Sequence, residues 1–375
     1  MYSYAAASCC QGKQERVGNH PRIGREKRLI EIFDGHNDSV QRIKEYSPNG
    51  IDFLERSTVG HLDLPRAEEG GMVGGLFAMF VRPEQPPRDN LTVTQAGHEV
   101  ALPGAISLAY AKREIAKQLA ALKTLEARAC GKIRLTTSVD EIERARLDHS
   151  FAMMIHMEGA ESIGPDLQEL DELYDSGLRS LGLVWSRPNI FGHGVSFGWP
   201  RSPDKGPGLT PLGMDLVREC NRLGVMIDLS HLNERGFWDV AELSAAPLVA
   251  THSCVHTICS STRNLTDMQL DAIRESDGIV GVNLCVNDVR PDGRRDGNTS
   301  LDMVACHFAY LADRLGVDHV AIGSDFDGTM IPAAIADASG LPNLVTALRE
   351  HGFDYTSLRK IASENWMRVL HLSLR

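Results

Sequence analysis

The sequence lacks the features that mark membrane, nucleic-acid-binding and disulfide-rich proteins. No uninterrupted apolar window of about 18 residues occurs, so we expect no membrane-spanning helix. No basic run occurs either, and 39 Lys and Arg against 50 Asp and Glu give a formal charge of −11. Such a chain has little attraction for nucleic acid or anionic lipid. The 8 Cys are scattered, with no CxxC pair, which indicates reduced thiols and no disulfide framework.

The first 28 residues are polar and show no apolar periodicity. This pattern predicts a flexible N-terminal arm over residues 1–28, followed by one domain over residues 29–375. The arm has no apolar core long enough for a signal peptide, so we expect a cytoplasmic protein. The sequence leaves the oligomeric state open, with a homodimer formed through surface helices as one expectation.

Eight short apolar runs follow the arm, and amphipathic stretches separate them. The runs are Leu29–Phe33, Met72–Val81, Phe151–Met157, Leu181–Trp185, Val225–Leu229, Pro247–Ala250, Ile279–Leu284 and His319–Ile322. Consecutive apolar positions are typical of strands buried on both faces. Helical patterns cover Leu209–Leu223, Glu234–Leu243, Thr266–Glu275, Ser300–Leu315 and Tyr355–Leu370. Strands alternating with helices predict an α/β protein with a (β/α)₈ TIM barrel.

Two long interruptions depart from this simple alternation. Ala101–Arg128 is rich in alanine and predicts an extra helical insertion. Arg187–Gly213 is rich in glycine and proline and predicts a long loop. Long loops in folded domains are usually either functional or disordered.

Imidazoles and carboxylates follow five of the eight apolar runs, at the strand ends where barrel enzymes place their active sites. Singly, each has an ordinary interpretation: an Asp can cap a turn, and a strand-end His is usually part of the hydrogen-bonded scaffold. Together they would crowd buried charge onto one rim without a partner, and a metal would supply that partner. The residues are His36, Asp38, Glu158, His231, His252, Asp325 and Asp327.

The ligand types indicate the metal. Imidazole nitrogens and carboxylate oxygens without thiolate suit Zn²⁺, with Mn²⁺ or Co²⁺ as alternatives. Three imidazoles and two or three carboxylates are more than one tetrahedral ion needs. They fit two metals that share a carboxylate and a hydroxide.

The sequence resembles the membrane (renal) dipeptidase family, peptidase family M19, a group of binuclear zinc peptidases related to the amidohydrolases. The resemblance covers about Leu29 to Leu370. The segments that carry it are DGHND, MEGAESI, MIDLSH, THSCVHTICSSTRN, GSDFDG and SENWMRVL. It implies a dipeptide substrate, sometimes with a D-residue at the C-terminal position, and two zinc ions per chain.

The resemblance also implies ligand roles at five positions. His36 and Asp38 would bind the first zinc. Glu158 would bridge both ions, where many amidohydrolases use a modified lysine. His231 and His252 would bind the second zinc.

Further roles concern the substrate. Arg263 would grip the free C-terminal carboxylate, and Asp325 would take a proton from the water and hand it to the leaving amine. The family's usual His after the fourth strand, which helps hold the scissile carbonyl, is replaced here by Trp185. His193 in the following loop could substitute for it, or Trp185 could form an apolar wall that changes substrate choice.

Three other residues have a mainly structural interpretation. His156 is expected either to pack in the core or to hydrogen-bond a metal ligand, and Asp228 is expected to support a metal ligand in the same way. His256 lies four residues after His252 but is expected not to bind metal.

Three functions remain open on the sequence: a dipeptidase, a metal-dependent amidohydrolase acting on another amide metabolite, and a non-catalytic binding barrel. The intact ligand set disfavours the last.

Overall fold

The computed structural model describes residues 29–84, 91–94 and 96–374. The predicted arm over residues 1–28 lies outside this range, and both it and the domain boundary stay predictions. Among the described residues, no helix has the length and apolarity needed to cross a membrane.

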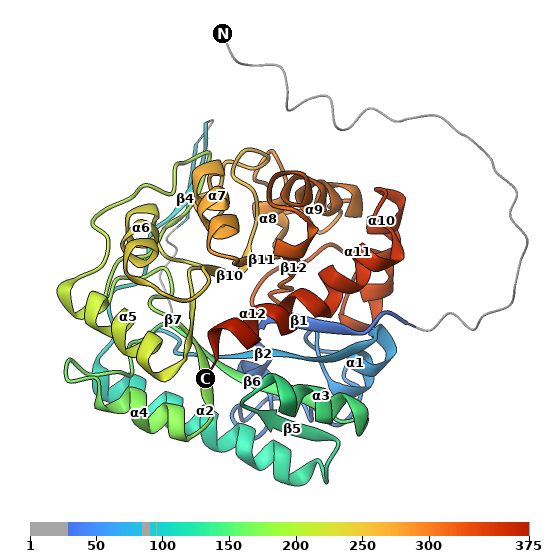
Figure 1. The fold of residues 1–375 in the computed structure, drawn as a ribbon, viewed down its shortest axis with the longest axis horizontal. Helices are drawn as coiled ribbons and strands as arrows, with labels where there is room; N and C mark the ends of the chain where they lie inside the picture. The colour runs from blue at the N-terminus through green and yellow to red at the C-terminus, as the bar shows by residue number, and fades with distance from the viewer. Residues whose placement is uncertain (1–28, 85–90, 95, 375) are drawn as a thin grey trace, which may run out of the picture.

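Eight parallel strands form a nearly closed barrel in the order β1-β2-β6-β7-β9-β10-β11-β12 (Figure 1). Their bounds are β1 Ile32–Asn37, β2 Met72–Phe80, β6 Phe151–Glu158, β7 Leu178–Gly182, β9 Met226–Asp228, β10 Val249–Ser253, β11 Ile279–Val282 and β12 Val320–Ile322. The last strand meets the first where Asp38 N donates to Phe326 O and Asp325 N donates to His36 O, at 2.8 and 2.9 Å. The predicted TIM barrel is confirmed.

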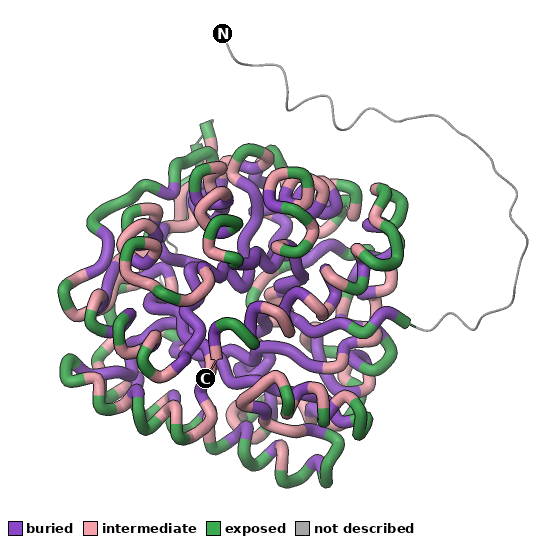
Figure 2. The backbone as a smooth tube through the Cα atoms, in the orientation of Figure 1, coloured by how far each residue is buried: buried purple, intermediate pink, exposed green. Residues whose placement is uncertain are grey.

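Helices surround the strands, and their outward faces are exposed while the ring of strands is buried (Figure 2). They are α1 Leu64–Gly70, α2 Leu108–Arg128, α3 Val139–Leu147, α4 Gln168–Asp175, α5 Pro211–Leu223, α6 Glu234–Leu243, α7 Asp267–Glu275, α8 Val286–Val289, α9 Leu301–Leu315, α10 Leu341–Glu350, α11 Tyr355–Arg359 and α12 Asn365–Ser373. A π-helical turn, Lys360–Glu364, joins α11 to α12. Short 3-10 turns cover Ser39–Arg42, Val317–His319 and Ala338–Gly340.

The predicted helical insertion is α2, and it begins later than the alanine-rich pattern does. Ser107 caps it by accepting a hydrogen bond from Tyr110 N, so the helix starts at Leu108. Pro103 and Gly104 precede this cap and favour an irregular backbone there.

Three predicted strands were misplaced along the chain. The first strand begins at Ile32 and continues to Asn37, so His36 lies inside β1 and not beyond its end. The fourth, β7, ends at Gly182, which leaves Trp185 in the segment that follows. The ladder with β6 ends at the Glu158–Gly182 pair, and this fixes where β7 stops. The sixth, β10, runs from Val249 to Ser253 and so includes His252.

A small antiparallel sheet lies outside the barrel and was not predicted. It comprises β3 Leu91–Thr94, β4 Gly97–Val100 and β8 Phe197–Trp199, in the order β3-β4-β8. The last strand comes from the predicted loop, and Val100 pairs with Phe197 in register. A further strand, β5 Ile133–Thr136, pairs with the first half of β6.

The C-terminal helix closes one end of the barrel. Trp366 of α12 is fully buried in a cluster with Phe33, Met154 and Ile279 from the strands, and its indole nitrogen donates to Ile322 O at 3.0 Å. A Cβ at Gly35 would lie 2.2 Å from the indole ring, so only glycine leaves room for it. Figure 1 shows α12 crossing the ring of strands. Because α12 covers the N-terminal end of the strands, a site can open only at their C-terminal end.

Candidate metal centre

Three imidazoles surround one carboxylate oxygen at the C-terminal end of the barrel. The Nε2 atoms of His36, His231 and His252 lie 3.7, 2.9 and 3.7 Å from Glu158 Oε1. Glu158 is the last residue of β6, His36 lies in β1 and His252 in β10. His231 follows β9 with a left-handed backbone, φ 68°. Strained backbone of this kind gathers at functional sites.

Hydrogen bonds behind the metal centre fix the tautomer of His252. Thr251 Oγ1 donates to Asp228 Oδ2 at 2.5 Å. The same hydroxyl lies 2.9 Å from His252 Nδ1, so it accepts a hydrogen bond from the Nδ1–H group. A neutral His252 then presents a bare Nε2 lone pair to Glu158 and to His231 Nε2, which is 3.1 Å away. Ser186 Oγ holds His231 Nδ1 in the corresponding place, at 2.7 Å.

The electrostatics of the cluster favour a bound cation. Burial, with the nearby positive groups, holds the pKa of each of the three imidazoles well below the usual value. Burial and the carboxylates of Asp38 and Asp325 raise the pKa of Glu158 well above its usual value. Neutral imidazoles beside crowded carboxylates form a ligand set whose chemistry fits a divalent cation.

Unpartnered polar atoms support the same interpretation. Both ring nitrogens of His36 and Oδ1 of Asp38 are buried without a hydrogen-bond partner. Buried polar groups almost always have partners, and such orphans point to an absent ion or water. His36, Asp38 and Glu158 place one ligand atom each within 4.8 Å of one another, and so do Glu158, His231 and His252. The chain thus offers two adjacent ligand groups that share Glu158, which fits a two-metal site.

Asp38 and Asp325 approach each other across the backbone of Gly328. A Cβ at Gly328 would lie 2.2 Å from Asp325 Oδ1 and 2.2 Å from Asp38 Oδ2. Asp325 has a left-handed backbone, φ 57°, and accepts a hydrogen bond from Asn283 Nδ2 at 3.0 Å. Burial raises the pKa of Asp325 to about 7, although Asn283 and Arg263 lower it. This carboxyl can therefore both take and give a proton near neutral pH.

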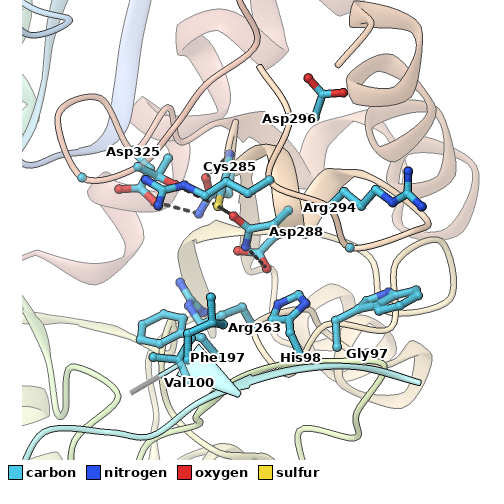
Figure 3. Close-up of a pocket in the computed structure, with 18 of the residues that line it drawn as sticks. Gly97, His98, Val100, Phe197, Arg263, Cys285, Asp288, Arg294, Asp296 and Asp325 are labelled. Atoms are coloured by element: carbon cyan, nitrogen blue, oxygen red, sulfur yellow. Dashed lines mark hydrogen bonds between the residues drawn. The ribbon is translucent and has the colours of Figure 1, made fainter. Parts of the chain in front are cut away.

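A cavity of about 1090 Å³ opens onto the cluster. Glu158, His231, Arg263 and Asp325 line it, as do the β3-β4-β8 sheet and residues 292–296 (Figure 3). Arg263 is 5% exposed, and its Nη2 donates to His252 O at 3.2 Å. Within the described part of the chain no other hydrogen bond holds this guanidinium, so its remaining donors can bind an anion.

The structure brings the predicted ligands, Arg263 and Asp325 together, but it does not bring His193 to them. His193 Nδ1 lies 3.4 Å from Gly208 O, and His193 is not among the residues that line the cavity. Trp185 does line it. The other aspartate of the motif, Asp327, instead pairs with Arg42 at 2.9 Å and accepts from Ser39 Oγ, which ties the β12 end to the segment after β1.

The residues with structural predictions lie behind or beyond the cluster. His156 is buried between Ser180 and Asp228, with Nδ1 2.9 Å from Ser180 Oγ. His256 Nε2 lies 2.9 Å from Arg201 O, away from the ligands.

Asn283 was not predicted as a site residue. It is the one polar residue inside the apolar run Ile279–Leu284, and this interruption was the signal.

Comparison with known proteins gives the family. The model of the membrane dipeptidase family, peptidase family M19, matches residues 24–373. The solved structure of dipeptidase AC, a metallopeptidase, is 46% identical with a TM-score of 0.86 and covers 92% of this chain and 99% of its own. A Rhodobacter sphaeroides metallopeptidase, solved with a phosphinate mimic of the dipeptide L-Ala-D-Ala, is 45% identical with the same TM-score and covers 92% and 100%.

An uncharacterised protein in the pqqA 5′ region of Klebsiella pneumoniae is 48% identical over 254 residues, which cover 68% of this chain and 94% of that protein. The family match and the two structures agree with the barrel described above, which carries candidate metal ligands at its strand ends. The chain therefore belongs to the membrane dipeptidase family, peptidase family M19.

Proposed function

We propose that this metal-dependent dipeptidase hydrolyses the peptide bond of dipeptides with two zinc ions as its cofactor. The observation that carries the proposal is the convergence of three imidazoles on Glu158, with Arg263 and Asp325 in the same cavity. A metal cluster, an anion-binding group and a proton carrier are the three parts that a carboxylate-anchored peptide hydrolysis needs.

The ligand assignment follows the two groups that share Glu158. His36 and Asp38 would hold one ion, His231 and His252 the other, and Glu158 both. When bound, the two ions would acidify a shared water to the attacking hydroxide and polarise the scissile carbonyl. Asp228 and Thr251 orient His252 from behind, and such support usually raises metal affinity.

Arg263 sets the class of substrate in this proposal. Its planar guanidinium can bind a carboxylate through two parallel hydrogen bonds. Because the Arg263 guanidinium donates to the carbonyl of the proposed ligand His252, a free C-terminal carboxylate held there would lie close to the metal centre. This arrangement fits a dipeptide.

Asp325 would move the proton. It would accept a proton from the attacking water and donate it to the amine as the C–N bond breaks. Asn283 holds one of its two carboxylate oxygens. Acceptance of a D-residue at the C-terminal position is part of the proposal, and the similarity to the Rhodobacter sphaeroides protein bound to an L-Ala-D-Ala mimic supports it.

The proposal is tested with L-Ala-D-Ala, L-Ala-L-Ala and their C-terminal amides, with zinc content measured in the same samples. We expect two zinc ions per chain and cleavage that a chelator abolishes. Arg263→Ala should lower kcat/KM for the free acids by about 10–100-fold, the worth of a charged hydrogen bond, and should change cleavage of the amides little. Arg263→Lys restores the charge without the planar fork and should recover activity only in part.

Two outcomes would contradict the proposal. Equal cleavage of the acids and the amides by the wild-type enzyme would remove the role of Arg263. Two bound zinc ions without turnover of any dipeptide would favour an amidohydrolase acting on another amide metabolite. The cytoplasmic location and the homodimer stay predictions.

A further inference from the structure

The rings of Trp185 and Phe197 lie side by side next to the metal centre, and we call this pair the aromatic wall. The two ring centroids lie 5.7 Å apart at 51°, and each lies about 6 Å from the imidazole of His231, at 5.9 and 6.0 Å. Both side chains line the cavity. The wall therefore stands next to a proposed zinc ligand, where a bound substrate would contact it.

A buried ion pair supports the wall from behind. The guanidinium of Arg187 lies 5.2 Å from the centroid of Trp185 and 5.4 Å from that of Phe80, in the range of cation–π contacts. Arg187 is fully buried, its Nε donates to Glu161 Oε1 at 2.7 Å, and its Nη2 donates to Val81 O at 2.6 Å. These contacts leave Arg187 little freedom, so the face of Trp185 is fixed.

Apolar side chains of the small sheet extend the wall. Leu91, Val93 and Val100 line the same cavity, and Figure 3 shows Val100 beside Phe197, across the cavity from Asp325. The cavity volume of about 1090 Å³ is at or above the upper end of the range for drug-sized ligands, about 300–1,000 Å³. A dipeptide of two small residues would leave much of this apolar surface in contact with water.

We infer that the aromatic wall binds a large apolar side chain of the dipeptide, with Trp185 as a specificity-determining residue and Arg187 as its positioning residue. The inference rests on the dipeptidase function proposed above and specifies its substrate class. Burial of an aromatic or long aliphatic side chain against two rings gains free energy that a small side chain cannot supply. The side chains of Asp292, Arg294, Arg295 and Asp296 also line the cavity, and because they are charged they offer no such surface.

The test uses two series of dipeptides, Xaa-Ala and Ala-Xaa, in which Xaa is Gly, Ala, Leu, Phe, Asp or Lys. For the wild type we expect kcat/KM for the Phe peptide to exceed that for the Ala peptide by at least about tenfold in one series. The series that shows the preference identifies which substrate residue the wall contacts, and a preference in either one supports the inference.

Variants then locate the preference. The Phe-to-Ala ratio should fall below about threefold in Trp185→His and Phe197→Ala, and most of the change should appear in KM. Arg187→Met should lower the same ratio, and Arg187→Lys should restore part of it because the charge returns. Trp238→Ala is the matched control, because Trp238 packs against Phe237 on α6, outside the cavity, and its ratio should equal that of the wild type.

The outcomes separate the two proposals. Cleavage of Ala-Ala without any preference for large apolar residues, or a preference that survives both wall substitutions, would overturn this inference and leave the dipeptidase function standing. Failure to cleave every dipeptide with two zinc ions bound would overturn both.

Discussion

Replacement of Gly328 by alanine should disable the metal centre by steric pressure alone. The backbone at Gly328 is not left-handed, so alanine brings no conformational strain of its own. Its Cβ would lie 2.2 Å from a carboxylate oxygen of Asp38 and 2.2 Å from one of Asp325, whereas real Cβ atoms essentially never approach closer than 3.0 Å. Each carboxylate must therefore retreat by about 0.8 Å.

That displacement would move both a proposed zinc ligand, Asp38, and the proposed proton carrier, Asp325. A misplacement of about 1 Å in catalytic geometry can lower the rate by about 10²-fold. We therefore expect Gly328→Ala to lower kcat/KM for L-Ala-D-Ala by about 50–100-fold and to bind less than two zinc ions per chain. Asp325 has little room to adapt, because Asn283 holds its other oxygen.

The assay measures kcat/KM and zinc per chain in parallel, with thermal unfolding as the check on folding. Gly104→Ala is the matched control, because a Cβ there would meet nothing within 4 Å, and it should behave as the wild type. Wild-type activity and full zinc content in Gly328→Ala would refute the placement of the two carboxylates around Gly328.

Three further predictions concern the proton carrier and stability. Asp325→Asn should lower kcat by about 10²–10⁴-fold with little change in KM; a mainly raised KM would assign it to binding instead. Burial lowers the pKa of His307 to about 4, so the folded state holds it neutral while the unfolded chain takes up a proton below pH 6.5. Its contribution to stability is therefore complete above pH 6.5 and is lost as the pH falls toward 4, by about 3 kcal/mol. Urea unfolding of wild type and His307→Gln should show their difference shrinking over this window, and a constant difference would refute the assignment. Trp366→Ala should lower the free energy of unfolding by about 3–5 kcal/mol, measured by urea unfolding, and a loss below about 1 kcal/mol would show that the indole is not a core element.

The sequence predicted the barrel because its strands are apolar on both faces, and this pattern is local. It also predicted that the proposed ligand residues meet at one rim, since parallel strands bring their C-terminal ends together wherever those ends fall in the chain. The misplacement of β7 shows the limit of the pattern. Its end depends on the ladder with β6, and a run of apolar letters continuing to Trp185 carries no information about that ladder.

Other parts of the site depended on contacts between distant segments. The small sheet pairs Val100 with Phe197, and neither strand is long or periodic enough to be recognised alone. The tautomer of His252 is set by Asp228 through Thr251, a chain of hydrogen bonds that three letters in a sequence do not specify. His193 lay in a suitable loop, but that loop directs its ring to the carbonyl of Gly208.

The meeting of the last strand with the first has a thermodynamic consequence. The hydrogen bonds that join them involve the backbones of His36, Asp38 and Asp325, the residues whose side chains form the proposed site. We call the junction between the last and the first strand the seam of the barrel. An ion held by those side chains would also stabilise this seam, since a ligand that binds only the closed form stabilises it by mass action. Chelation should then accelerate amide hydrogen exchange at Asp38 and Asp325 more than in β7, which lies across the ring from the seam and carries no proposed ligand. In this protein, occupancy of the active site and closure of the fold would be a single equilibrium.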